Sequence, residues 1–551
     1  MNRSSRPDLK LPHRTVAPQQ SAKYLGVILD QHLSWAPQCA NVIEKGSKWI
    51  SQIKHIARPS WGITPSYARK LYIGTALPKV LYGVEVWHTP TPEKIRKRGG
   101  KLRGSVKVTT KLASVQRAGA IAVTGGLRTS PTDTLNALAN LLPSEAIIDK
   151  WCYRAALRLA ALHDKHPLRK PIKRCTRSRV KKHRSPLHLL LRVLDADTRL
   201  VAPKAIATHN PAKLVRPPFE VRIPTSKENS KREAQAASEE IQVFTDGSVI
   251  EGKVGAAAVL TRPGKDHRFL HYHLGSENEY TIYDAELAGL AMGLHLIKTE
   301  RKARRGTMMG ADNQAAITAV QNELSTPSHY IAKDILRTAQ QIKKLRGHKS
   351  YVLMLRWTAG HVGIDGNELI DEEAKKAAKG QSSPPSSLPC LLRQKLKIST
   401  AALKQSHNKD VKARWRNKWA KSLRGKRDHQ IDSSSPSPLF IKCISNPKLP
   451  RQAASLISQL RIAHIPLNSY LHKFKCVDST RCPACGAAKE TVQHFLLSCP
   501  GYAHERWALE KAIKCKPNMK TLLGEQESAL ALKNYVYATH RFDNKPANNG
   551  E

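Results

Sequence analysis

Four acidic residues in the middle of the chain lie at predicted strand ends and in predicted helices, which meet at one edge of an α/β fold. Asp246 closes the strand predicted in "QVFTDGSVI", and Asp312 closes the one predicted in "GTMMGADNQ". Glu286 lies in the first turn of a predicted helix, and Asp371 lies in a later helix, one turn after Asn367. Strand ends and helix N-termini line one crevice of an open α/β sheet. Taken singly, each acid fits an ordinary helix cap or surface position, so only their combination points to a shared site.

Such a combination of acids implies metal chemistry. Four carboxylates in one crevice would repel one another unless divalent cations neutralised them, and hard oxygen ligands suit Mg²⁺ or Mn²⁺. Two such ions about 3.5–4 Å apart can activate a water molecule and stabilise the leaving oxygen of a phosphodiester. We therefore expect two Mg²⁺ (or Mn²⁺) ions at these acids.

A second set of chemistry-bearing residues lies near the C-terminus, in "RCPACGAAKETVQHFLLSCPGY". Cys482 and Cys485 form a C-x2-C pair, His494 follows after eight residues, and Cys499 follows after four more. This spacing gives four tetrahedral ligands for one Zn²⁺, and with no open position the site would be structural. The alternative is a set of reduced, buried cysteines with His494 as an ordinary helix residue.

The elements that must position the four acids are predicted within residues 241–380. Short β-rich runs bounded by turns predict strands, and apolar residues at helical spacing predict helices. The predicted strands are 241–248, 254–262, 267–275, 306–314 and 350–361, and the predicted helices are 283–299, 315–322, 330–346 and 366–379. This order predicts an α/β domain, a mixed sheet covered by helices.

Residues 241–380 resemble the type 1 ribonuclease H domains of retroelement polyproteins. The motifs that carry the resemblance are "FTDGS" (244–248), "YDAELAGL" (283–290), "GADNQAAI" (310–317) and "AGHVGIDGNELIDEEAKKA" (359–377). The resemblance implies a ribonuclease H-like fold and cleavage of the RNA strand of RNA–DNA hybrids.

The resemblance also implies roles for individual residues. The four metal-binding acids would be Asp246, Glu286, Asp312 and Asp371. His361, on the "AGHVGIDG" loop, would assist deprotonation of water or product release; without its neighbours it would be read as an ordinary loop histidine. Asn313 and Gln314 would contact the substrate. Asp365 and Glu368 are left out of the metal set, because Asp365 is placed in the loop and Glu368 would point elsewhere on its helix.

The charge of the chain is unevenly distributed. The 551 residues hold 92 Lys and Arg against 43 Asp and Glu, a formal net charge of +49. Residues 241–380 hold 19 basic and 16 acidic residues, so the other residues hold 73 against 27, a net of +46. Basic flanks around a near-neutral domain suit a polyanion, with nucleic acid as the first candidate. The alternative is that these runs are solvated faces and tails.

The flanks resemble other parts of non-LTR retrotransposon polyproteins. "KYLGVILDQHLSW" (23–35) and residues 116–145 look like the region that follows the fingers and palm of their reverse transcriptases, and the cysteine module resembles their terminal CCHC finger. The chain contains no adjacent Asp-Asp pair, which the polymerase active site requires, so we expect no polymerase activity.

These observations predict five regions. They are a truncated reverse transcriptase thumb and connection-like region (1–164), a basic linker (165–240), a type 1 ribonuclease H domain (241–380), a linker with a basic helical segment (381–439) and a C-terminal region with the zinc finger (440–551).

The leading functional hypothesis is a metal-dependent endoribonuclease that acts on RNA–DNA hybrids. A binding protein without catalytic activity, derived from a retroelement, is the main alternative, and the complete acid set argues against it. An integrase or transposase would need a different acid spacing. The sequence has no apolar run near the ~18 residues of a membrane span and no secretory h-region. We therefore expect an intracellular, nuclear protein.

Overall fold

The structure is a computed structural model that describes residues 7–88, 106–177, 186–191, 194, 200–203, 218–300, 306–321, 328–346, 351–486 and 489–543. The basic run "EKIRKRGGKLRG" (93–104) lies outside these residues. The chain divides into two compact units, one formed by residues 1–152 with 411–551 and the other by residues 153–410. Among the described residues, no helix combines the length and apolarity needed to cross a membrane.

The second unit is built on a sheet which, within the described residues, has six strands in the order β5-β10-β9-β6-β7-β8. Strands β6, β7 and β8 are successive antiparallel neighbours, whereas β6-β9, β9-β10 and β10-β5 are parallel pairs. The strands are β5 (Glu220–Arg222), β6 (Ile241–Ile250), β7 (Lys253–Arg262), β8 (Lys265–Ser276), β9 (Gly306–Ala311) and β10 (Val352–Trp357). The prediction of a mixed sheet is confirmed.

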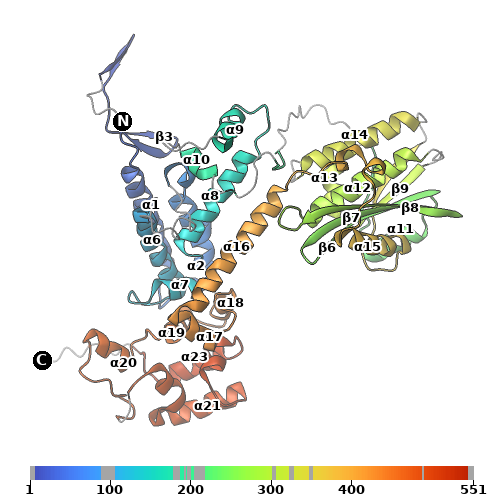
Figure 1. Ribbon diagram of the computed structural model, residues 1–551. Helices are drawn as coiled ribbons and strands as arrows, with labels where there is room; N and C mark the ends of the chain where they lie inside the picture. The colour runs from blue at the N-terminus through green and yellow to red at the C-terminus, as the bar shows by residue number, and fades with distance from the viewer. Residues whose placement is uncertain are drawn as a thin grey trace. The chain divides into compact units, whose positions relative to one another are not determined.

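Helices cover both faces of this sheet, as Figure 1 shows in green, yellow and orange. The helices of the unit are α9 (Arg169–Arg177), α10 (Pro186–Leu191), α11 (Lys227–Gln235), α12 (Ile282–Thr299), α13 (Gln314–Gln321), α14 (His329–Arg346) and α15 (Asp365–Ala378). Alternation along β6 separates the two cores: Val243 packs with the α12 side, and Phe244 packs with the α15 side. This two-sided burial holds β6 rigidly at the centre of the domain.

Two stretches that were predicted as linkers contribute to this unit. Within 165–240 the structure forms α9, α10, β5 and α11, and β5 extends the sheet by pairing with β10. The Pro/Ser-rich stretch after residue 380 leads into Leu388, Leu392 and Leu396, which are buried in the α12-side core. Short polar elements carry too little periodic apolar signal to be predicted, because tertiary pairing stabilises them.

The other unit is mostly helical and combines both ends of the chain. Its N-terminal part has the hairpins β1 (Leu9–Leu11) with β2 (Arg14–Val16) and β3 (Ser21–Tyr24) with β4 (Val27–Asp30). The helices that follow are α1 (Ala36–Ile56), α2 (Pro65–Leu71), α3 (Leu77–Val80), α4 (Val84–Trp87), α6 (Val106–Thr124), α7 (Thr132–Leu138) and α8 (Ser144–Ala160). The later helices are α16 (Thr400–Lys421), α17 (Leu423–Ile431), α18 (Leu439–Cys443), α19 (Arg451–Ile462), α20 (Asn468–Leu471), α21 (Ala503–Ile513), α22 (Met519–Gly524) and α23 (Ala529–Ala538). The unit boundary passes within α8 and α16.

Interactions between distant parts of the sequence hold this helical unit together. The buried Arg451 of α19 donates to the carbonyl oxygens of Ala122 and Val123, at 2.7 and 2.9 Å, and so satisfies the C-terminal end of α6. Gln459 donates to the carbonyl of Gly125 at 2.8 Å. The C-terminal region therefore folds against the N-terminal helices, an arrangement that the sequence did not predict.

A buried ion network in this unit gives a stability prediction. Arg461 lies 3.0 Å from Asp428 and 3.2 Å from Asp432, with its side chain 1% exposed. Arg461→Ala would leave both carboxylates uncompensated, so we expect the free energy of unfolding to fall by about 3–5 kcal/mol. Arg424→Ala is the matched control, because the Arg424–Asp133 pair is exposed and such pairs contribute about 0–1 kcal/mol. Denaturant titration of both variants measures this, and equal losses would contradict it.

Candidate active site and zinc site

Asp246 lies inside β6, so the prediction that it closes the strand is wrong. It pairs with Ala257 of β7, and β6 continues along β7 to Ile250. On the other side, the parallel pairing of β6 with β9 stops at Thr245, opposite Ala311. Asp246 is therefore the first β6 residue beyond the parallel ladder, at the crevice where neighbouring strands separate.

Asp312 directly follows the last residue of β9. Two hydrogen bonds from the end of β10 fix its backbone: Trp357 Nε1 donates to the carbonyl of Asp312 at 2.8 Å, and Thr358 N donates to the carbonyl of Ala311 at 2.9 Å. The prediction that Asp312 stands at the end of its strand is therefore correct in position, and its carboxylate faces the same crevice as Asp246.

Glu286 is the fifth residue of α12, just beyond the first turn in which it was predicted. The helix begins with a capping box between Thr281 and Asp284, which fixes its first turn. Gly247 faces this helix: a Cβ there would lie 2.8 Å from both Ala285 Cβ and Glu286 N. The missing side chain lets α12 approach β6 closely enough for the Glu286 carboxylate to reach Asp246.

Three of the predicted acids meet in space. Carboxylate oxygens of Asp246, Glu286 and Asp312 all lie within 4.8 Å of one another. Asp371, on α15, lies outside this tight group and pairs with Lys375 at 2.7 Å. It is nevertheless near enough for its charge to raise the pKa values of Asp246 and Asp312.

Burial and mutual repulsion dominate the electrostatics of this cluster. Burial, then the charges of Asp312 and Asp371, raises the pKa of Asp246 to about 7. Burial, then the charges of Asp246 and Asp312, raises the pKa of Glu286 well above its usual range. The pKa of Asp312 is raised by burial and by Asp371, and the charge of His361 partly offsets this.

The donor set fits a divalent cation. Glu286 Oε2 is buried and finds no hydrogen-bond donor among the described residues. A buried carboxylate oxygen without a partner is costly, and a cation beside three hard oxygen donors would satisfy it. Asp246, Glu286 and Asp312 would hold the ion or ions, with Asp371 at the edge of the site.

The remaining predicted residues surround this cluster. His361 is exposed, in the loop between β10 and α15, and its backbone has φ 56°. Asn313 accepts from Ala316 N at 3.1 Å and so caps α13, and its side chain partly offsets the raised pKa of Glu286. Gln314 is exposed at the start of α13. Asp365 begins α15 and is not a loop residue, which corrects its predicted place.

Sequence reasoning missed Ser230, which fixes the base of the His361 loop. This buried residue of α11 donates to the carbonyl of Trp357 at 3.1 Å and accepts from Ala359 N at 2.9 Å. The only local sign of α11 is its N-cap Ser226, whose side chain accepts from Asn229 N. Nothing in the sequence connects that helix to the loop 129 residues later.

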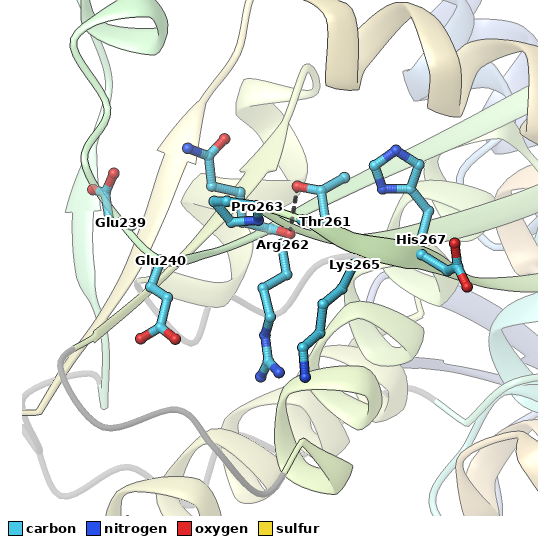
Figure 2. Close-up of a pocket in the computed structure, with 10 residues that line it drawn as sticks. Glu239, Glu240, Thr261, Arg262, Pro263, Lys265 and His267 are labelled. Carbon is cyan, nitrogen blue, oxygen red and sulfur yellow. Dashed lines mark hydrogen bonds between the residues drawn. The ribbon is translucent and has the colours of Figure 1, made fainter.

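Two grooves border the sheet. Figure 2 shows one of about 1040 Å³, lined by residues such as Thr261, Arg262, Lys265 and His267, at the opposite end of β6 from the carboxylates. The other, of about 590 Å³, includes Val249, three residues after Asp246, and Ala315, three residues after Asp312. None of the four acids lines either groove, and the smaller groove includes Ile282, one turn before Glu286 on α12.

The predicted zinc ligands also meet. Ligand atoms of Cys482, Cys485, His494 and Cys499 all lie within 4.8 Å of one another. Cys482 Sγ and Cys499 Sγ are 3.6 Å apart, and Cys485 Sγ is 3.5 Å from His494 Nε2. The sulfur separation exceeds the ~2.05 Å of a disulfide and is near the ~3.8 Å that tetrahedral zinc with ~2.3 Å Zn–S bonds requires. The donor set therefore fits a closed zinc site.

The surroundings hold this module in place. The fully buried Glu490 lies 2.7 Å from Arg541 and accepts from Asn468 N at 2.5 Å. Phe495, buried after His494, packs against the rings of Tyr502, Tyr535 and Phe542. The module therefore has an ion pair and an aromatic core in addition to its four ligands.

Comparison with known families assigns the sheet domain. The family model for RNase H matches residues 238–379. These residues form an RNase H domain. The match contains all four predicted acids, and β5 and α11 lie before its first residue.

Proteins similar to this chain include retrotransposon proteins. It is 31% identical over 134 residues to the Retrovirus-related Pol polyprotein from type-1 retrotransposable element R1 3 of Nasonia vitripennis, covering 24% of this chain and 32% of that protein. It is 23% identical over 137 residues to the putative 115 kDa protein in type-1 retrotransposable element R1DM of Drosophila melanogaster, covering 25% of this chain and 12% of that protein. The matches thus span a third or less of these two relatives.

Solved structures similar to the RNase H domain include two RNase H1 proteins. LC11-RNase H1 in complex with RNA/DNA hybrid is 15% identical, with a TM-score of 0.21, over 25% of this chain and 96% of that chain. RNase H1 from Halobacterium salinarum is 14% identical, with a TM-score of 0.19, over 26% of this chain and 98% of that chain.

The repulsion within the RNase H site gives a pH-dependent prediction. The folded-state pKa of Asp246, about 7, exceeds its unfolded value of 3.8. Its ionisation therefore costs little below about pH 4, and it lowers stability progressively between about pH 4 and pH 7, above which the loss levels off. In Mg²⁺-free buffer we expect Asp246→Asn to raise the free energy of unfolding by roughly 2–4 kcal/mol at pH 8, and by much less at pH 4.5.

Denaturant titration at the two pH values measures this effect, with the exposed Asp266→Asn as control. Added Mg²⁺ should stabilise the wild type more than Asp246→Asn. A variant that is less stable than the wild type at pH 8 without Mg²⁺ would show that the carboxylates do not repel one another.

The zinc site predicts metal content. We expect about one zinc per chain, lost in a Cys482→Ala/Cys499→Ala double variant and retained in Cys476→Ser/Cys515→Ser, whose cysteines are exposed. Metal analysis of the purified chains measures this. Because structural zinc contributes folding free energy, a chelator should also lower the thermal stability of the wild type. Full zinc content in the Cys482→Ala/Cys499→Ala variant would refute the four-ligand site.

Proposed function

We propose that the RNase H domain hydrolyses the RNA strand of RNA–DNA hybrids in a metal-dependent reaction. The observation that carries this proposal is the buried cluster of Asp246, Glu286 and Asp312, with one Glu286 oxygen left without a donor. Carboxylates whose pKa values are raised by burial and mutual repulsion are typical of sites that act on charged substrates.

The chain's own residues would divide the work between them. Divalent ions bound by the acids would supply a polarised water and stabilise the leaving oxygen. Asp246, Glu286 and Asp312 would hold these ions, since their carboxylate oxygens lie within 4.8 Å of one another. His361, exposed on its loop and near enough to Asp312 to lower the pKa of that carboxyl, would accept a proton from water or assist product release.

Substrate selection would rest on groups beside the cluster. Gln314 is exposed at the edge of the site and would contact a 2′-hydroxyl, the group that distinguishes RNA from DNA. Asn313, which caps α13 and moderates the pKa of Glu286, would face the substrate. The smaller groove beside Val249 and Ala315 would accommodate the strand that continues from the cleaved phosphodiester.

Substitution of Asp246 should remove cleavage of the hybrid but retain most of the binding affinity for it. Asp246→Asn keeps the shape of the side chain but removes its charge and a strong metal ligand. We expect the cleavage rate of a labelled RNA–DNA hybrid in Mg²⁺ to fall about a thousandfold or more, since each tenfold loss is only about 1.4 kcal/mol of barrier. Hybrid affinity should largely survive, because +46 of the +49 charge lies outside 241–380. That affinity should fall steeply with added salt.

The matched control is Asp365→Asn, which changes an exposed acid at the start of α15 and should cleave near the wild-type rate. Near-normal cleavage by Asp246→Asn would exclude this cluster as the active site. A wild-type chain that binds hybrid but never cleaves it with Mg²⁺ or Mn²⁺ would favour the alternative, a binding protein without catalytic activity.

A further inference from the structure

The connection after α1 and the helix α2 that follows it present two exposed aromatic rings, each next to a cation: Trp61 lies in the connection, and Tyr67 lies in α2. Trp61 is 54% exposed and Tyr67 is 60% exposed. The guanidinium carbon of Arg58 lies 5.5 Å from the centroid of the Trp61 ring, and Lys70 Nζ lies 5.2 Å from that of Tyr67. A single exposed aromatic residue is ordinary on a protein surface, but two that share one short basic segment are not scattered singly.

The turn that carries Trp61 is fixed by its backbone. Ile63 N donates to the carbonyl of Ile56 at 2.9 Å, and Ala57 forms an antiparallel bridge with Gly62. Gly62 has φ +112°, and a Cβ there would lie 2.2 Å from Ile56 O, so only glycine fits this close return. The indole is thus presented by a rigid turn, which lowers the entropy lost when a ligand binds.

The part of the chain around Trp61 and Tyr67 is basic. Residues 45–84 contain no Asp or Glu and seven basic residues: Lys45, Lys48, Lys54, Arg58, Arg69, Lys70 and Lys79. Arg69 donates hydrogen bonds to the carbonyl oxygens of Ala139 and Asn140, at 2.9 and 2.7 Å, so it is not counted among the cations that would face a ligand. Lys54, Arg58 and Lys70 are exposed, and within the part of the chain that the structure describes none of the three forms an ion pair.

The neighbouring segment adds positive charge. Ser66 N donates to Ser445 Oγ at 2.9 Å, and Arg451 Nε donates to the carbonyl of Arg58 at 3.2 Å, so residues 445–451 pack against this surface. They include the exposed Lys448 and no acidic residue. The whole surface therefore attracts anions.

We propose that Trp61 and Tyr67, together with Lys54, Arg58 and Lys70, form a binding site for single-stranded nucleic acid. Unpaired bases would stack on the two rings, and the cations would face the phosphates. The two aromatic residues are six positions apart, so their Cα atoms lie within about 20 Å of each other, a span that one short strand can cover. Base pairs inside a duplex offer no free faces for such stacking. This site is independent of the carboxylate cluster.

The test measures binding of the full chain to a labelled 20-nucleotide RNA, to the matching DNA strand and to a blunt DNA duplex by fluorescence anisotropy. Trp61→Ala/Tyr67→Ala should weaken binding of single strands roughly 5- to 100-fold, the loss that removal of base–aromatic stacking produces. Duplex affinity should change little. Trp61→Phe/Tyr67→Phe keeps both rings and should bind single strands almost as the wild type does.

The matched control is Trp507→Ala. Trp507 is 61% exposed and has Lys511 at 5.5 Å from its ring, but Glu505 and Glu510 flank it on the same helix and no second exposed aromatic accompanies it in α21. Its removal should leave affinity unchanged. An equal loss in Trp507→Ala, or an equal loss for the duplex, would overturn the proposal, as would unchanged single-strand binding by the double Ala variant.

A second measurement does not depend on the aromatic variants. Replacing Lys54, Arg58 and Lys70 by Ala should make single-strand affinity less dependent on salt, with the log–log slope smaller by about 0.7 for each phosphate that is no longer neutralised. An unchanged slope would show that these cations do not face the phosphates and would also overturn the proposal. Affinities for the RNA and DNA strands, compared under one salt condition, identify which of the two the site prefers.

Discussion

Repulsion among the buried carboxylates of Asp246, Glu286 and Asp312 is the constraint on which the rest of the RNase H domain depends. Three acids with oxygens within 4.8 Å of one another cannot all ionise cheaply away from water. The domain holds them together because β6 is packed on both faces, with Val243 toward α12 and Phe244 toward α15. Hydrophobic burial on the two faces of β6 thus offsets the electrostatic repulsion among the three carboxylates. A divalent cation would relieve that repulsion.

The cysteine and histidine cluster offers the opposite donor chemistry. Cys482, Cys485, His494 and Cys499 are soft or borderline donors that suit one closed site, whereas the carboxylates are hard donors. Burial raises the pKa of Cys499 to about 12, so a thiolate there would depend on a cation. The first donor set suits an ion that holds a fold together, and the second suits the proposed reaction on a substrate.

The RNase H domain also extends beyond the residues that match its family. Strand β5 continues the sheet, Ser230 of α11 fixes the base of the His361 loop, and Leu388, Leu392 and Leu396 close the α12-side core. In the helical unit, Arg451 satisfies the last carbonyls of α6 from the far end of the sequence. In both units, segments that look like linkers or separate modules complete cores whose main elements lie elsewhere in the chain.

Local sequence patterns were sufficient to predict the α/β class and the order of the sheet's main elements, and to select seven of the residues that the structure gathers into two clusters. Each of these features has a local signal: period-2 and helical patterning, the residues around Asp246, and the C-x2-C pair of Cys482 and Cys485.

Such patterns could not show that β6 continues past Asp246, because the length of that strand is set by its pairing with β7. Nor could they show which acids come together, since Asp246, Glu286 and Asp312 form one tight group while Asp371 stays paired with Lys375 at its edge. The three-dimensional fold also places β5, α11 and the C-terminal helices in larger units. The physical reason is that short polar elements and single buried cations gain their stability from partners more than a hundred residues away, and no local pattern encodes such pairing.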